Sequence, residues 1–145
     1  MKVLKIISVM LVFVMLSCSF IACNNSGNNE NETNQETKAK VSITVSFKVK
    51  DKDGKIIAEQ TGYKFDGANP TVLAIIDDYF TIIKDWEVKS TDGTLESIGE
   101  YKADSEYIWA FYMGTTADGK RIDDKKMGDY EISDGDGFTV YLDKL

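Results

Sequence analysis

Hydrophobic and polar residues alternate over the first long stretch after residue 40. Val41–Lys50 places Val, Ile and Phe at every second position, with Ser, Thr and Lys between them. This is the period of a β-strand with one buried face and one wet face. Residues 51–54 (DKDG) are typical of a hairpin turn, and residues 55–65 return as a second strand. The pattern predicts that the folded part of the chain begins with a β-hairpin.

A helical period replaces this alternation after residue 69. One apolar stripe consists of Val72 and of Ile75, Ile76, Tyr79 and Ile83, which follow Val72 by three, four, seven and eleven residues. Asn69 is a suitable N-cap, and Pro70 is favoured at the first helical position. We therefore expect a helix that begins at residues 69–70 and packs its stripe against a sheet.

Shorter apolar runs separated by turns fill the rest of the chain. We expect strands at residues 86–89, 95–101, 107–113 and 138–142, a turn at 91–93, a long polar loop at 115–128 and a tight turn at 133–137. The glycines of the last turn permit positive φ. The predicted fold is α+β and β-grasp-like, with a mixed sheet of about five or six strands and one helix packed on it.

The run Tyr107–Met113 (YIWAFYM) carries large groups on both faces of its predicted strand. Tyr107, Trp109, Phe111 and Met113 share one side, and Ile108, Ala110 and Tyr112 share the other. Such a strand is either buried on both faces or presents one face to a ligand. Both interpretations remain open from the sequence.

The first 22 residues are typical of a secretory signal peptide. Lys2 and Lys5 precede an apolar run over residues 6–16, which is short for a membrane span of roughly 20 residues. Residues 20–23 (FIAC) resemble the lipobox of bacterial lipoproteins, and Cys18 offers a competing site. The resemblance implies that Cys23 is acylated and becomes the mature N-terminus. The protein is then lipid-anchored on the extracytoplasmic face of the bacterial cell membrane.

Residues 23–40 follow as the lipidated cysteine and a tether. Residues 24–40 contain no aromatic and no large aliphatic side chain, so we expect disorder there and a folded domain at 41–145. Without Lys2 and Lys5 the formal net charge is −9, because 15 basic and 24 acidic residues remain. This charge opposes binding to nucleic acid.

The chemistry of catalysis is missing from the sequence. The chain has no histidine, and acylation of Cys23 would leave the mature chain without a free thiol, so His-based and Cys-based catalysis or metal binding is excluded. Asp51 with Asp53, and Asp134 with Asp136, could be calcium ligands, but their Gly-rich settings favour turns. We expect no enzyme, no metal and no resident cofactor.

Several motifs together resemble the transcobalamin C-terminal-like family, whose members include many bacterial surface proteins of unassigned function. They are Trp109 with Tyr112, Gly114 after the strand, residues 129–136 (DYEISDGD) and residues 69–73 (NPTVL). The resemblance implies a β-grasp-like domain and, as in the vitamin carriers, a corrinoid or other planar apolar ligand. The contacts that it implies are Trp109, Phe111, Tyr112, Met113 and Gly114.

Two departures from the carriers leave an alternative function open. The carriers hold the corrin against a large helical domain, which is absent here, and without histidine no imidazole can ligate cobalt. The alternative is a cell-surface protein-interaction or scaffold module without a small-molecule ligand. Its partner would then be another surface protein.

Overall fold

The computed structural model describes residues 39–116 and 119–145, all within the compact unit Glu36–Leu145. The predicted signal peptide, both candidate lipidation cysteines and tether residues 23–38 lie outside the described residues. Within the described part, no helix is long and apolar enough to cross a membrane.

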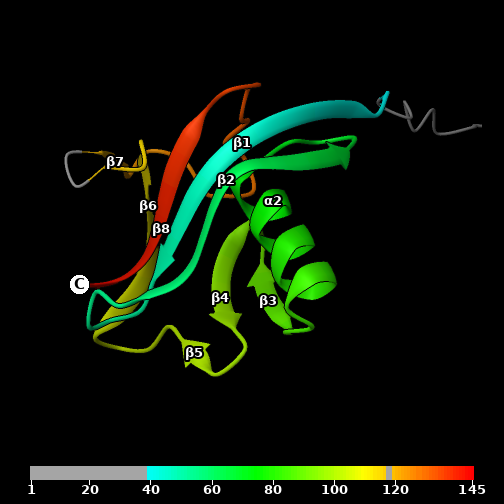
Figure 1. The fold of residues 1–145 in the computed structure, drawn as a ribbon. Coiled ribbons are helices and arrows are strands. Elements are labelled where there is room, and N and C mark those ends of the chain that lie inside the picture. The colour runs from blue at the N-terminus through cyan, green and yellow to red at the C-terminus, as the bar shows by residue number, and fades with distance from the viewer. Residues whose placement is uncertain (1–38, 117–118) are drawn as a thin grey trace, which may run out of the picture. The chain divides into compact units, whose positions relative to one another are not determined.

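A five-stranded mixed sheet forms the larger layer of the domain (Figure 1). Its order is β2-β1-β8-β6-β7. The strands are β1 (Val41–Lys50), β2 (Ile56–Gly67), β6 (Tyr107–Met113), β7 (Lys120–Ile122) and β8 (Gly137–Lys144). β1 runs parallel to β8, and the other neighbours are antiparallel. The predicted hairpin, the two-faced strand and the last strand are confirmed.

The structure adds a strand that the sequence analysis missed. β7 lies within the stretch expected to be loop and pairs with β6 through Phe111↔Ile122 and Tyr112↔Arg121. It has only three residues, so periodicity along the chain could not distinguish it from loop.

A second sheet of three strands, β3 (Val88–Thr91), β4 (Thr94–Ile98) and β5 (Tyr101–Lys102), was expected as part of the first. The predicted turn is confirmed at Asp92 and Gly93, which have φ of 49° and 75°. The expected single strand over 95–101 is wrong, because the chain turns at Gly99 (φ 55°). A Cβ at Gly99 would lie 3.4 Å from the Trp86 ring, so glycine fits both the turn and the contact. The β-grasp-like topology stays a prediction.

The helix α2 (Val72–Asp78) begins later than expected, with Thr71 and not Asn69 as its N-cap. Thr71 Oγ1 accepts a hydrogen bond from the Ala74 backbone N at 3.2 Å. Thr71 is also extended, and it forms a bridge with Glu131. This tertiary pairing holds Thr71 and the residues before it outside the helix, which explains why the helix begins later than the sequence predicts.

A π-helical segment, η1 (Tyr79–Ile83), continues α2 and changes which residues face the core. Val72, Ile75, Ile76 and Tyr79 are buried as predicted. Ile83 is 59% exposed, and Phe80 is fully buried in its place. Wider winding in a π-turn adds a residue and rotates the following side chains, so the 3.6-residue period fails after Tyr79.

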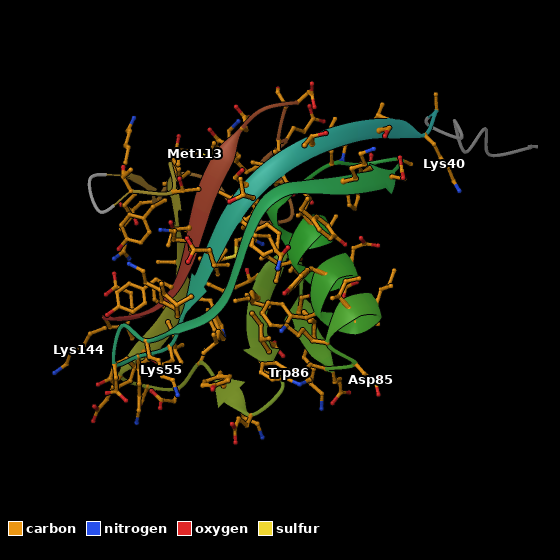
Figure 2. The ribbon with its side chains drawn as sticks, viewed as in Figure 1. Lys40, Lys55, Asp85, Trp86, Met113 and Lys144 are labelled. Carbon is orange, nitrogen blue, oxygen red and sulfur yellow. The ribbon has the colours of Figure 1, made fainter. Side chains whose placement is uncertain are left out.

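The core fills the space between the larger sheet on one side and the helix with the smaller sheet on the other (Figures 1 and 2). Phe47 lies at its centre, stacked on Phe138 at 5.5 Å between ring centroids and edge-on to Tyr79 at 5.1 Å. Trp86 and Asp85 follow the end of the helix (Figure 2), and Trp86 stacks on Phe80 at 5.5 Å. This packing leaves the other face of the larger sheet open.

The acidic pairs considered as calcium ligands accept hydrogen bonds from backbone N–H groups in or near the turns. Asp51 accepts from the backbone N of Asp53 and Lys55 at 3.0 and 2.9 Å. Asp134 accepts from Thr44 N at 2.7 Å, and Asp136 accepts from Ser133 N at 2.8 Å. In the described residues, no group of three or more potential metal ligands comes together.

Candidate functional site

The two-faced strand β6 divides the residues that the sequence proposed as ligand contacts. Trp109 and Phe111 are 6% and 2% exposed and belong to the core. Tyr112 lies half-buried on the opposite, open face, where it pairs with Thr139 of β8. Met113 and Gly114 lie half-buried at the end of the strand (Figure 2 labels Met113). These five residues do not form one surface, and their role in binding stays a prediction.

A cavity of about 190 Å³, which we call the Trp109 cavity, opens where the two sheets meet. Its walls come from the start of β4, from β6, from β7 and from the segment that follows β7. The lining residues are Thr94, Leu95, Ile108, Trp109, Ala110, Phe111, Arg121, Ile122, Asp123, Lys125, Lys126 and Met127. The lining is thus apolar with a charged rim, as is common for small-molecule sites.

The indole N–H of Trp109 is unusual among the side chains of the described residues. Among side-chain polar atoms in the described residues, Trp109 Nε1 alone is buried without a hydrogen-bond partner. A buried donor left unpaired costs about 1–3 kcal/mol, and native structures contain few such groups. A buried tryptophan N–H normally finds an acceptor, so this group requires an explanation.

The rim of the Trp109 cavity is mainly basic. Arg121 donates to Asp123 at 2.6 Å and to Asp143 at 2.8 Å, so both neighbouring carboxylates are already paired. Lys125 lies over the Tyr130 ring at 5.6 Å. Lys125 and Lys126 have no carboxylate within 4 Å among the described residues. Two uncompensated cations therefore stand at the mouth of the cavity.

Backbone contacts fix the segment that closes the Trp109 cavity. Gly128 N donates to Gly93 O at 2.9 Å, and a Cβ on Gly128 would lie 2.6 Å from the Gly93 Cα. Leu73 N donates to Met127 O at 3.1 Å. Met127 is buried, although charged residues precede it in the chain. The two glycines allow a backbone approach that holds the Met127 side chain in the cavity wall.

The open face of the larger sheet carries a hydrogen-bonded network around Tyr112. Its hydroxyl donates to Asp143 at 2.6 Å, and the same carboxylate accepts from Arg121. Burial, followed by the hydrogen bond to Asp143, raises the pKa of Tyr112 above its usual value. A second hollow of about 220 Å³ lies beside this network, lined by Lys50, Tyr112, Thr116, Gly119, Thr139 and Tyr141.

A larger hollow lies elsewhere, between α2 and the β3–β4 hairpin. It measures about 760 Å³ and is lined by Asn69, Thr71, Leu73, Ala74, Asp77, Val88, Ser90, Gly93, Gly128, Asp129 and Glu131. Its lining includes three carboxylates and no basic side chain among the described residues. Its three carboxylates belong to exposed residues that water can solvate, whereas the lining of the Trp109 cavity includes the buried residues Trp109, Phe111 and Met127.

Sequence reasoning missed the residues that complete the Trp109 cavity. Leu95 comes from the smaller sheet, while Lys125, Lys126 and Met127 come from a segment interpreted as a solvated loop. One indication was available in the sequence, because Met127 is a large apolar residue directly after four charged ones. The approach of β4 to β6 could not be inferred, since it depends on how the two sheets pack.

The described residues form a small α+β domain of two sheets, with the Trp109 cavity of about 190 Å³ where the sheets meet. No family model matches the sequence, and no curated protein matches it. A similar solved structure is that of haptocorrin in complex with Cbi (cobinamide), with a TM-score of 0.52 and 14% identity. The match covers 74% of this chain and 26% of that chain.

A second structural match is a protein of Ruminococcus gnavus ATCC 29149 to which metal binding has been ascribed. Its TM-score is 0.43 at 15% identity, with 71% of this chain and 98% of that chain covered. At these identities, the haptocorrin match supports a transcobalamin-like fold, in agreement with the resemblance found in the sequence. The second match carries no further weight.

Proposed function

We propose that the protein is a lipid-anchored extracytoplasmic ligand-binding domain for a corrinoid or another planar apolar ligand. The observation that carries the proposal is the likeness of the fold to haptocorrin, which was solved in complex with Cbi. The match covers only 26% of that chain, so a domain of this kind would supply one side of a binding site. A partner protein or a second ligand-binding surface would supply the other side of the binding site.

The dimensions of the cavities limit where such a ligand can lie. The Trp109 cavity and the hollow beside Tyr112 measure about 190 and 220 Å³, below the usual 300–1,000 Å³ of drug-sized sites. A corrin macrocycle bound at β6 would therefore lie on the surface, since the larger hollow of about 760 Å³ is formed by α2 and the β3–β4 hairpin instead. We place it at the end of β6, against Met113 and Gly114 with Tyr112 beside them, while Trp109 and Phe111 support the strand from the core.

Cobinamide titration tests this proposal through tryptophan fluorescence. The chain has two tryptophans, so Trp86→Phe makes Trp109 the sole reporter. We expect saturable quenching, and we expect Met113→Ala to weaken it without changing the melting temperature by more than a few degrees. Absence of saturable quenching at high micromolar cobinamide would exclude a corrinoid. Lys55→Ala, in the hairpin turn far from Met113 (Figure 2), serves as the control.

The burial of Trp109 and Phe111 favours a second candidate, a surface protein-interaction or scaffold module without a small-molecule ligand. In that case these aromatics serve only the core, and cobinamide leaves the fluorescence unchanged. The partner would be a surface protein, detected by crosslinking on intact cells and identified by mass spectrometry.

Membrane anchoring is tested separately from ligand binding. We expect Cys23→Ser to abolish incorporation of labelled palmitate and to release the protein from the cell envelope. We expect Cys18→Ser to leave both unchanged. The opposite result would assign the lipid to Cys18, and no labelling of the wild-type protein would contradict the lipoprotein assignment.

A further inference from the structure

The strand β2 has one edge without a partner strand. It is the last strand of the larger sheet, and within the described residues it pairs with β1 alone (Figure 1). No other backbone–backbone hydrogen bond in this part of the chain involves residues 56–67. A strand of 12 residues presents a long row of N–H and C=O groups along such an edge. This edge can therefore accept a further strand, as in β-strand addition.

A bulge in the middle of β2 determines which of its side chains share a face. The register with β1 shifts between Gln60 and Tyr63, and Gly62 within the shift has a φ of 69°. Glu59 and Lys64 are five positions apart, so in a regular strand they would point to opposite faces. The extra residue of the bulge brings both to the outer, exposed face of the sheet. On that face, β2 thus carries an acidic side chain before the bulge and a basic one after it.

These two charges are complementary to those of a second, antiparallel copy of β2. When Glu59 lies opposite Lys64 of the second copy, two-fold symmetry also places Lys64 opposite Glu59 of that copy. Opposite charges that face each other across two strands are stabilising. Gln60 and Tyr63 lie opposite each other in the same way, and both point to the inner face. The two-fold axis passes through the bulge, so the register is the same on both sides of it.

The charges also distinguish this register from its neighbours. Glu59 Oε1 accepts from Lys48 of β1 at 3.0 Å, and Oε2 takes no part in this ion pair. Lys64 has no carboxylate within 4 Å among the described residues. Registers that keep the same faces together differ by two residues. A shift of two in one direction sets Glu59 against Asp66, which has the same charge, and a shift in the other direction sets it against Gly62.

We propose that two copies of this chain associate through β2, in antiparallel pairing with Glu59 opposite Lys64 of the other copy. The larger sheets then join into one continuous sheet. The hydrogen bond from the Tyr63 hydroxyl to Asp78 holds β2 against α2, so the edge is ordered before association and loses little entropy on pairing. β6 is separated from β2 by two strands, so dimerisation does not depend on corrinoid binding at the end of β6.

Disulfide crosslinking tests the register. Chains with Glu59→Cys and chains with Lys64→Cys are expressed together, oxidised with copper phenanthroline and separated on a non-reducing gel. We expect a crosslinked dimer, because directly opposed Cβ atoms lie about 4.5–5.5 Å apart. Either variant expressed alone should give no more dimer than the wild-type chain, which controls for Cys18 and Cys23. Its two cysteines would lie about 16 Å apart along the strands, outside disulfide range.

A charge reversal tests the affinity with the native cysteines in place. Lys64→Glu sets a glutamate opposite Glu59 on both sides of the axis, and sedimentation equilibrium should show a dimer dissociation constant raised about threefold to thirtyfold. Lys120→Glu makes the same change on β7, at the other edge of the sheet, and should dimerise as the wild type does.

Three results would each overturn the inference. They are a wild-type chain that stays monomeric at high micromolar concentration, crosslinking of the single cysteine variants equal to that of the pair, and an unchanged dissociation constant in Lys64→Glu. Cobinamide quenching is measured independently on the same protein, so either proposal can fail alone.

Discussion

The phenolic hydroxyls of Tyr63 and Tyr112 each donate a hydrogen bond to a carboxylate, Asp78 and Asp143 respectively. For Tyr63, burial is the largest cause of a raised pKa, followed by the hydrogen bond to Asp78. Such a bond requires the protonated phenol in the folded state. At the residue scale, the interactions between strand and helix therefore depend on pH.

We predict that Tyr63→Phe lowers the free energy of unfolding by about 1 kcal/mol at neutral pH, because it removes a partly exposed hydrogen bond. The folded-state pKa of Tyr63 is raised, so its contribution is complete below the unfolded value of about 10 and is lost as pH rises towards the folded value. Urea unfolding from about pH 8 to about pH 11 should show the difference between the two proteins narrowing above pH 10. A constant difference would contradict the assignment.

Burial also distinguishes Trp109 from Ile82, another large apolar residue. Trp109→Ala should lower the free energy of unfolding by about 3–5 kcal/mol, since it leaves a large cavity in the core. Ile82→Ala removes a side chain that is 68% exposed and should change stability by less than about 0.5 kcal/mol. Equilibrium denaturation in urea measures both. A mild effect at Trp109 would mean that its ring is not part of the core.

At the scale of the elements, the start of α2 shows where local propensity and tertiary pairing compete. Asn69-Pro70 is a strong helix start by sequence, yet the cap is Thr71. Asn69 O accepts from Thr71 N at 2.9 Å, and Ile132 N donates to Pro70 O, so these two residues form a connection to the strand-like segment at 131–132. The backbone bonds of this segment therefore determine where the helix begins.

We predict that Thr71→Ala destabilises the protein by about 1 kcal/mol through loss of the cap, while Asn69→Ala stays within about 0.5 kcal/mol of wild type. Thermal unfolding followed by far-ultraviolet circular dichroism provides the comparison. Thr71→Ser retains the capping oxygen and should recover most of the loss. Equal losses of stability in Thr71→Ala and Asn69→Ala would contradict the assignment of Thr71 as the N-cap.

At the scale of the whole molecule, two glycines join the smaller sheet to the segment that closes the Trp109 cavity. A Cβ on Gly128 would approach the Gly93 Cα to 2.6 Å, which is closer than side-chain atoms pack. Because both partners are backbone, neither can move aside as a side chain would. This contact therefore couples the packing of the sheets to the shape of the cavity.

Gly128→Ala should lower the free energy of unfolding by about 1–3 kcal/mol, the usual cost of overpacking. Asp124→Ala, an exposed change in the same segment, is the matched control and should alter stability little. Equilibrium unfolding in urea measures both variants. If Gly128→Ala were as stable as the wild type, the backbone segments at Gly93 and Gly128 would be able to move apart.

The pattern of the sequence by itself determined most of the strands, the presence of one helix and the turn residues. These features depend on side chains a few positions apart, so alternation in β1 and β8, the three-to-four spacing from Val72 to Tyr79, and the Asp-Gly turns were sufficient. The same pattern could not show that Ile83 leaves the core, because the π-turn that exposes it interrupts the helical period.

Only the tertiary structure decided how the strands divide into two sheets, which face of β6 is buried and where the candidate site lies. The sequence is compatible with Trp109 either in the core or in a binding site. In the structure, Leu95, Ile122 and Met127 line the same cavity as Trp109, and they lie between 14 positions before it and 18 positions after it in the chain. Contacts of this kind arise from the packing of sheet on sheet, and no local period encodes them. The unpaired indole N–H and its cavity are therefore properties of the folded molecule.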